Sequence, residues 1–386
     1  PILNMEYVVV GLAKYKIAWL PGDGIGKDVL DATRIVLDAV NFSAEYYEGR
    51  IGWSCWVSEG NPLPDETIEL LKKTDACMFG AITSKPPGEA EKELPEHLRG
   101  KVKYRSPIVR LRQLFDLYIC FRPCKAYPGN PLNYRENIDI VVFRENTEDL
   151  YFGAEIDNFP EDLKKYHPEL AKIPAGAAVS FKVITRRGSE RIIRAAFEWA
   201  KKNGRKRVTC VHKANVVRAA DGLFRKTFYE IAEEYPEIEA DDANVDSFCQ
   251  WVLKDPTKYD VIVAPNLYGD IISDLIAQMV GGLGFAPSGN IGDKYGVFEP
   301  VHGSAPKYAG KYVVNPIAAI LASKIMLDWL GEKKLAECIE RAVADTIREA
   351  PPEVRTYDWG GPKKEGQTLV LARYIAEKAK QYAETI

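Results

Sequence analysis

Two aspartates stand four residues apart in the segment 264–274, which reads APNLYGDIISD. A strand pattern precedes them and a helical pattern follows, so Asp270 and Asp274 should lie near a helix start with both carboxylates on one side. Two anions held this close suit a hard divalent cation. The spacing alone also allows a structural interpretation, in which Asp270 caps the helix and complements its dipole.

Three arginines border apolar segments, where a solvated surface charge is less expected: Arg112, Arg122 and Arg144. Each offers a planar fork of donors suited to bidentate carboxylate binding, so together they could converge on a polyacid. Taken singly, each is an ordinary surface or ion-paired arginine. Tyr151 follows Arg144 by seven residues. Arginines near this tyrosine would favour its ionised form, which suits an acid/base role.

Lys213 and Asn215 follow the apolar run 207–211. A lysine directly after a strand is often only a solvated loop residue. Together with the other groups, however, it completes a chemical set. The aspartates would hold a metal that chelates a substrate hydroxyl and carboxylate, and the lysine would take the hydroxyl proton. The arginines would bind the other substrate carboxylates, and the tyrosine would protonate an enolate. This set predicts oxidative decarboxylation of a 2-hydroxy acid.

A glycine-rich turn at residues 21–26 reads PGDGIG and follows a predicted strand. It resembles a dinucleotide-binding fingerprint, but the third glycine of G-x-G-x-x-G would fall at position 27, which is Lys27. No acidic residue clearly ends a second strand about twenty residues later, as that fingerprint requires. Any dinucleotide must therefore bind to another architecture.

The elements that position these groups alternate between strands and helices. Strands are expected at residues 15–20, 76–79, 207–211 and 261–264, and helices at 64–73, 189–203, 223–233 and 316–330. A further helix is expected where apolar residues recur between Val29 and Val40. The fold class is therefore α/β. The segment 179–185 partly alternates apolar and polar residues, which favours an antiparallel strand or arm that pairs with another chain.

Composition narrows the possible functions. The chain has 386 residues, 46% of them hydrophobic, and a net charge of -3, which fits a globular protein of two domains. No long run of one charge sign occurs, so we expect neither a nucleic-acid nor a membrane partner. Seven cysteines without a C-x-x-C pair, and the lack of a signal core, indicate a cytoplasmic protein with reduced thiols.

Six sequence blocks together resemble the isocitrate and isopropylmalate dehydrogenase family, and they run in the family's order over nearly the whole chain. The blocks are LPGDGIG at 20–26, DLY at 116–118, FRENTEDLY at 143–151, HKAN at 212–215, NLYGDIISD at 266–274 and HGSAP at 302–306. The metal-aspartate block is close to diagnostic, whereas the glycine block alone is weak.

The resemblance implies an isopropylmalate dehydrogenase-like α/β fold rather than a Rossmann fold. A large domain would comprise residues 1–117 and 281–386, and a small domain residues 118–280, with an intersubunit clasp near 152–187. Two chains would share each active site in a homodimer. The implied reaction is metal-dependent oxidative decarboxylation of isocitrate to 2-oxoglutarate, with homoisocitrate or 3-isopropylmalate as alternative substrates.

The resemblance also assigns residues to roles. Tyr151 would be the general acid and Lys213 would act with it from the partner subunit. Mg²⁺ or Mn²⁺ would bind Asp270 and Asp274 together with Asp246 of the other subunit. The substrate-binding residues would be Ser106, Ile108, Arg112, Arg122, Arg144 and Asn215.

Substrate choice depends on the helix before Arg112. Bacterial isocitrate enzymes pair a serine six residues before this arginine with an asparagine four residues before it, and here these positions hold Ser106 and Ile108. The apolar Ile108 resembles isopropylmalate enzymes, whereas the blocks 116–123 and 144–151 resemble isocitrate dehydrogenase more. The segment 84–103 is also longer and more charged than the corresponding loop of many bacterial isocitrate enzymes. Isocitrate is therefore favoured.

The implied cofactor is NADP, with NAD possible. It would lie against the loop after residue 301 rather than on a glycine fingerprint; the implied cofactor residues are His302, Gly303, Ser304, Ala305, Lys307, Tyr308, Asn315 and Tyr357. A lysine and tyrosine hydroxyls suit a 2′-phosphate. Two arginines expected in NADP enzymes are replaced by Gly361 and Asp255, for which Lys254, Lys363 or Lys364 could compensate.

Two interpretations from other classes remain. A silent regulatory subunit would keep the fold but lose a metal aspartate, the lysine or the tyrosine, and all of these are present. A non-enzymatic anion-binding protein could use the arginines alone, without needing Lys213, Tyr151 and three metal aspartates together. Phosphorylation at Ser106 is a regulatory event that the resemblance allows.

Overall fold

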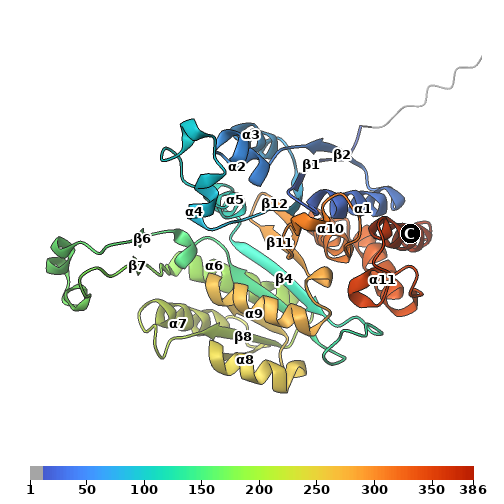
Figure 1. Ribbon diagram of the computed structural model, residues 1–386. Helices are drawn as coiled ribbons and strands as arrows, with labels where there is room; N and C mark the ends of the chain where they lie inside the picture. Colours follow the sequence, from blue (N-terminus) through green and yellow to red (C-terminus); the bar gives the residue numbers. More distant parts are fainter. Residues whose placement is uncertain (1–11) are drawn as a thin grey trace, which may run out of the picture.

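The computed structural model describes residues 12–386 and contains one long mixed sheet (Figure 1). Its ten strands lie in the order β2-β1-β3-β12-β11-β4-β5-β10-β8-β9. Their bounds are β1 (Tyr15–Gly22), β2 (Ala44–Glu48), β3 (Ala76–Ala81), β4 (Ile119–Lys125), β5 (Asp139–Glu145), β8 (Arg207–His212), β9 (Glu239–Asn244), β10 (Val261–Ala264), β11 (Pro287–Ile291) and β12 (Gly296–Pro300).

Helices cover the sheet. Their bounds are α1 (Gly26–Ala39), α2 (Trp53–Glu59), α3 (Asp65–Lys72), α4 (Pro87–Lys92), α5 (Pro107–Leu114), α6 (Arg186–Lys202), α7 (Ala220–Ala232), α8 (Val245–Lys254), α9 (Asn266–Met279), α10 (Ile317–Leu330), α11 (Lys333–Glu349) and α12 (Gln367–Ala383). None of the helices in residues 12–386 is both long and apolar enough to cross a membrane.

The sheet is parallel at both ends and antiparallel in the middle. β11 runs antiparallel to both β12 and β4, and β4 runs antiparallel to β5. The outer pairs, including β1 with β3 and β10 with β8, are parallel. This mixed order confirms the α/β class and excludes the all-parallel sheet of a Rossmann fold. β11 joins β4 across the expected domain boundary without a break in the sheet, and the two-domain division stays a prediction.

Alternating apolar residues bury both faces of the sheet. Val141 and Val263 pack with α6 and α7 on one face, whereas Val142 and Ile262 pack with α8 and α9 on the other. At the opposite end, residues of β1 likewise divide between two core clusters. Because successive side chains of a strand point to opposite faces, this alternation builds a layer of helices on each side.

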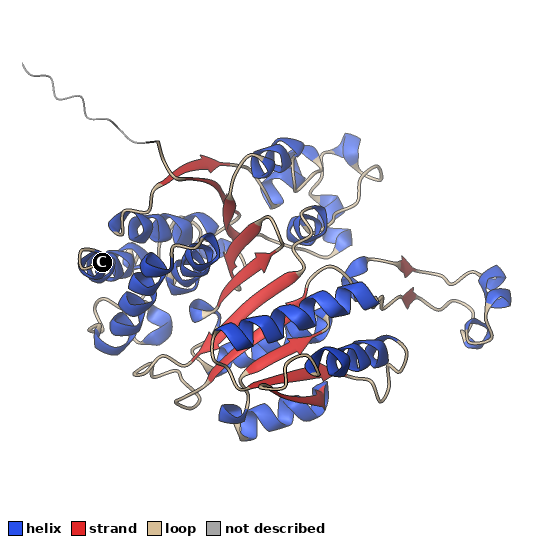
Figure 2. Cartoon of the chain, turned by 180° about the vertical axis from the view of Figure 1, so that it is seen from behind, coloured by secondary structure: helices blue, strands red, loops and turns tan. Residues whose placement is uncertain are grey.

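The expected elements are present, with ends that differ by a few residues, apart from the strand at 179–185. There, only β7 (Val179–Ser180) is a strand, and it pairs with β6 (Glu155–Ile156). The two strands form the base of an arm, residues 154–181, which projects from the body of the molecule in both views (Figures 1 and 2). Beyond this pair, the described residues add only an isolated bridge between Asp149 and Val183 to the expected strand.

Candidate active site

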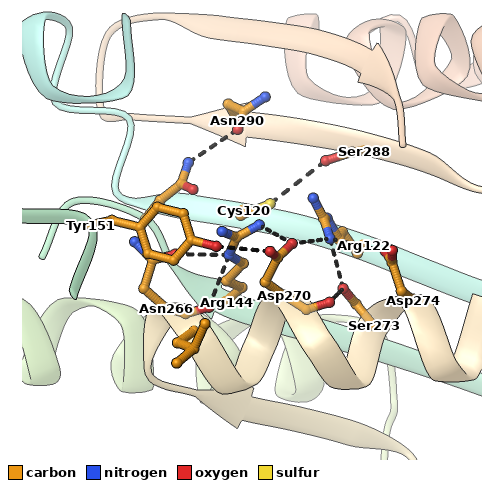
Figure 3. Close-up of polar contacts among 12 residues, drawn as sticks. Cys120, Arg122, Arg144, Tyr151, Asn266, Asp270, Ser273, Asp274, Ser288 and Asn290 are labelled. Atoms are coloured by element: carbon orange, nitrogen blue, oxygen red, sulfur yellow. Dashed lines mark hydrogen bonds and ion pairs between the residues drawn. The ribbon is translucent and has the colours of Figure 1, made fainter. Parts of the chain in front are cut away.

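Asp270 is the centre of a partly buried polar cluster (Figure 3). Its Oδ1 accepts hydrogen bonds from Arg144 at 2.8 Å and from Arg122 at 3.2 Å, while its Oδ2 accepts one from the Tyr151 hydroxyl at 2.8 Å. Asp270 lies on α9, and Tyr151 lies in the short 3-10 helix η2 (Leu150–Phe152). The structure thus brings together residues that lie more than a hundred positions apart, as the sequence predicted for the arginines, the tyrosine and the aspartate.

The strand register positions the arginines. Arg144 on β5 lies opposite Cys120 on β4, two residues before Arg122. Arg144 is 2% exposed and Arg122 is 6% exposed, so both charges are withdrawn from water. The buried Nε of Arg122 has no hydrogen-bond partner in the described part of the chain.

Arg112 enters the same cluster from α5. Its Nε donates to Asn290 Oδ1 at 2.9 Å, and the residue is 5% exposed. Within residues 12–386, its two terminal nitrogens have no hydrogen-bond partner. Three buried guanidinium groups therefore lie close together, and some of their N–H donors have no partner in the described residues. Such an arrangement suits an anion with several carboxylates.

The pKa of Tyr151 lies above its ordinary value. Burial is the main cause, and the adjacent Asp270 carboxylate adds to it, while Arg144 and Arg112 act in the opposite direction. The arginines do favour the ionised form, as expected, but burial and the Asp270 carboxylate outweigh them, so the net shift is towards the protonated phenol. At neutral pH the phenol keeps its proton, which suits a general acid.

The two aspartates of α9 differ in environment. Burial opposes ionisation of Asp270, but Arg144 and Arg122 outweigh it and lower its pKa. Burial raises the pKa of Asp274, and its nearest cation is Arg122 at 3.6 Å. Both carboxylates are oxygen donors on one helix face, which fits a hard divalent cation. No group of three metal-ligating side chains occurs within residues 12–386 of one chain, so this pair lacks a third protein carboxylate.

Lys213 and Asp246 form a second cluster. Lys213, after β8, donates from Nζ to Asp246 Oδ1 at 2.6 Å, at the start of α8. Asp246 keeps 67% of its side chain exposed, and Asn215 is exposed as well. Within residues 12–386, no hydrogen bond or ion pair joins these residues to Asp270 or Tyr151. The structure therefore divides the predicted site residues into two groups within one chain.

A polar network supports the Lys213 segment. His212 Nε2 lies 2.7 Å from Asp242 Oδ2, and its Nδ1 accepts a hydrogen bond from the backbone N–H of Ala214 at 2.9 Å. Arg225 and Tyr229 also donate to Asp242. Burial disfavours the Asp242 carboxylate, but these donors outweigh it and hold its pKa at about 2.

Asp242→Asn is expected to lower the free energy of unfolding by about 2 kcal/mol at pH 7. Because the folded pKa is depressed, this stabilisation exists above the unfolded pKa near 4 and disappears as the pH falls towards about 2. Urea unfolding across this pH range measures it. The control is Asp241→Asn on the same strand. A difference that does not change with pH would contradict this explanation.

The helix that carries the expected substrate-selecting residues is α5. Ser106 is its N-cap residue and makes no side-chain cap hydrogen bond. Ile108 is 9% exposed and packs with Leu111 and Leu117 in a core cluster. The serine hydroxyl is therefore available at a helix N-terminus, where carboxylates are favoured, whereas Ile108 lies mainly in the core.

The glycine turn packs against the expected cofactor loop. A Cβ on Gly24 would lie 2.0 Å from the Ser304 carbonyl oxygen, and its φ is +56°, so only glycine fits there. Ser304 also exchanges a 2.6 Å hydrogen bond with Thr83. The turn therefore supports the 302–305 loop, which comprises His302, Gly303, Ser304 and Ala305.

Cationic and aromatic groups gather beside this loop. Lys363 donates to the Tyr308 hydroxyl at 3.3 Å, and its ammonium lies 5.2 Å from the ring centroids of Tyr308 and Tyr357. Lys307 lies 4.9 Å from the Tyr308 ring. Hydrogen bonding to Lys363 lowers the pKa of Tyr308. Asn315 is already engaged, because its amide donates to Asp358 and its Oδ1 accepts from a backbone N–H.

Three polar residues of the site were missed by sequence reasoning: Asn266, Ser273 and Asn290. Asn266 accepts from Arg144 Nε at 2.9 Å, and Ser273 accepts from Arg122 at 2.7 Å. Both lie on α9, so their spacing from Asp270 could have placed them on its face. Asn290 lies on β11, and no local pattern indicated that this strand pairs with β4.

The family described as isocitrate/isopropylmalate dehydrogenase matches residues 16–374. The chain is 43% identical over 378 residues to a homoisocitrate dehydrogenase of Methanocaldococcus jannaschii, covering 95% of this chain and 99% of the relative. It is 42% identical over 361 residues to a 3-isopropylmalate dehydrogenase of Methanothermobacter thermautotrophicus, covering 94% and 97%. A crystal structure of isocitrate dehydrogenase from Methylococcus capsulatus matches with a TM-score of 0.83 and 38% identity, covering 95% of this chain and all of the other.

Proposed function

Because the chain belongs to the isocitrate/isopropylmalate dehydrogenase family of β-hydroxyacid oxidative decarboxylases, we propose that it oxidises and decarboxylates isocitrate to 2-oxoglutarate. The observation that carries the proposal is the meeting of Arg112, Arg122 and Arg144. In the described residues, these three buried cations lie near the carboxylates of Asp270, Asp274 and Glu299. The arginines still have donors without a protein partner, among them the buried Nε of Arg122, and these could bind the carboxylates of a polyacid.

The chain's own residues would move the protons. Lys213 of the partner subunit would accept the proton of the substrate hydroxyl, and the nicotinamide cofactor, when bound, would supply the acceptor for the hydride of the same carbon. The carboxylate β to the new ketone then leaves as carbon dioxide, and Tyr151 donates its proton to the carbon left behind. The raised pKa of Tyr151, caused mainly by burial, keeps that proton in place at neutral pH.

The metal would be Mg²⁺ or Mn²⁺, held by Asp270 and Asp274 with Asp246 of the partner subunit. When bound, such an ion polarises the hydroxyl and ketone oxygens and stabilises the developing enolate charge. The missing third carboxylate in one chain and the exposure of Asp246 both support a site shared by a homodimer.

The proposed cofactor is NADP, with NAD as the alternative. Ammonium and hydroxyl donors lie beside the 302–305 loop; they belong to Lys307, Lys363, Tyr308 and Tyr357. A 2′-phosphate is recognised by such groups and would be repelled by a carboxylate at the same place. Lys363 supplies a cation near the position where the expected arginine is replaced by Gly361.

Homoisocitrate is the second candidate substrate. It carries the same three carboxylates as isocitrate but one more methylene, so the arginine donors do not separate the two acids. The homoisocitrate relative favours it. The free hydroxyl of Ser106 at the N-terminus of α5 supports binding of a distal carboxylate in either acid and counts against the alkyl group of 3-isopropylmalate.

Initial rates of cofactor reduction with Mg²⁺ test the proposal. Isocitrate is expected to exceed 3-isopropylmalate by about a hundredfold in kcat/KM, because an alkyl group leaves buried donors unpaired. NADP is expected to exceed NAD. Homoisocitrate measured in parallel decides between the two tricarboxylic acids. Turnover of 3-isopropylmalate alone would refute the substrate assignment, and binding of all three acids without turnover would identify a non-catalytic anion-binding protein or regulatory subunit.

A further inference from the structure

Lys182 forms a buried bridge between two carboxylates. Its Nζ lies 2.8 Å from Asp149 Oδ1 and 3.4 Å from Asp221 Oδ1. The lysine side chain is 13% exposed, and both aspartate side chains are fully buried. Lys182 directly follows the arm, and its ammonium also lies 4.4 Å from the centroid of the Tyr268 ring. The bridge lies outside the substrate and metal clusters.

One end of the bridge holds the Tyr151 segment. Asp149 accepts hydrogen bonds from the backbone N–H groups of Leu150 at 2.8 Å and Leu267 at 3.0 Å. Its own N–H donates to Val183 at 2.7 Å, and its φ is +70°. Asp149 therefore joins the residue before Tyr151 to the first turn of α9, the helix that carries Asp270.

The other end holds the Lys213 segment. Asp221, on α7, accepts a 2.7 Å hydrogen bond through Oδ2 from the backbone N–H of Lys213. Its Oδ1 has no hydrogen-bond partner in the described residues, so the ammonium of Lys182 is what compensates that buried charge. Without the lysine, two buried carboxylates would lose their shared cation, and both would move towards water.

We propose that Lys182 is a positioning residue that sets the general acid and the lysine base of one chain at the same time. The inference rests on the proposed function, in which Tyr151 serves the chain's own site and Lys213 serves the partner's site. One Lys182 therefore acts on both active sites of the dimer. Tyr151 and Lys213 each act on only one.

Mixed dimers with different affinity tags on the two chains test this. The Lys182→Met homodimer is expected to lose kcat by about tenfold to a hundredfold, with a smaller change in KM, because misplaced acid and base groups slow chemistry more than binding. The heterodimer of wild type with Lys182→Met should lose far more than half of its activity. A heterodimer of wild type with Tyr151→Phe should keep about half.

Two controls accompany the mixed dimers. Lys182→Arg should recover most of kcat, because it restores a cation between the two carboxylates. Lys72→Met, on α3, removes an exposed lysine paired with Glu69 and should leave activity unchanged. A Lys182→Met heterodimer that keeps half of its activity would overturn the inference. Wild-type protein without turnover would instead refute the proposed function.

If Lys182→Met does not yield a folded dimer, a second pair of variants tests whether the two ends of the bridge act on different active sites. With Asp149→Asn and Asp221→Asn on the same chain, opposite a wild-type chain, both sites should be impaired. With the two substitutions on different chains, the altered Tyr151 segment of one chain and the altered Lys213 segment of the other serve the same site. The second site has neither defect, so about half of the activity should remain. Equal activity of these two arrangements would overturn the inference.

Discussion

Mixing two inactive variants is expected to restore activity. The Tyr151→Phe and Lys213→Met homodimers should each fall by at least about a hundredfold in kcat, because each loses a proton-transfer group. When chains of both kinds are unfolded and refolded together, about half of the dimers should contain one chain of each kind. In such a dimer, one site has both defects and the other has an intact Tyr151 and an intact Lys213.

The refolded mixture should therefore recover about a quarter of wild-type activity. The structure motivates this expectation because Lys213 pairs with Asp246 and has no hydrogen bond to the Tyr151 and Asp270 cluster of its own chain. The control places both substitutions on one chain and isolates its heterodimer with wild type by different affinity tags; neither site of that heterodimer is intact, so it should be inactive. Failure to recover activity, although heterodimers form, would show that each site uses the tyrosine and lysine of a single chain.

Asp270→Asn is expected to have the largest effect of any single substitution. Asp270 is a proposed metal ligand, and its Oδ1 is also shared by Arg144 and Arg122. The amide weakens metal binding and leaves two buried guanidinium groups without that counter-charge. We expect kcat/KM to fall by about a thousandfold or more, since Lewis-acid stabilisation supplies several kcal/mol.

Calorimetry of Mn²⁺ binding in the presence of isocitrate separates the loss of a metal ligand from the loss of the counter-charge to the two arginines. Asp270→Asn should weaken Mn²⁺ binding and should not regain wild-type turnover at high metal concentration. Asp293→Asn is a matched control, because Asp293 also accepts a hydrogen bond from a tyrosine, Tyr118, at 3.0 Å, but lies outside the cluster. Unchanged Mn²⁺ affinity in Asp270→Asn would remove Asp270 from the metal site.

The arrangement of the two aspartates of α9 was predictable because their spacing is local in sequence. The position of Asp270 and Asp274 on one helix face follows from the strand before them and the helical period after them. The protonation of Tyr151 was not predictable, because it depends on burial of the phenol and on its hydrogen bond to Asp270, which together outweigh the arginines. That contact joins residues 119 positions apart.

The fold was predictable in its elements but not in their order. Strands such as β10 have clear apolar patterns, whereas the antiparallel centre depends on β11 pairing with β4, which lies far from it in the sequence. The Lys182 bridge was missed for a similar reason. Its partners, Asp149 and Asp221, lie in separate segments that show no shared pattern, and only the packed structure places both within reach of one ammonium group.

The arm has a consequence for how the protein folds. Its ladder contains only two residue pairs, and Phe152 and Phe181 at its base are 56% and 38% exposed. A two-stranded ribbon of this length has little stability of its own in water. In the proposed homodimer, the body of each chain would form from its own contacts, whereas the arm would gain lasting order only after two chains meet. The final folding step should be bimolecular, and its rate should increase with protein concentration.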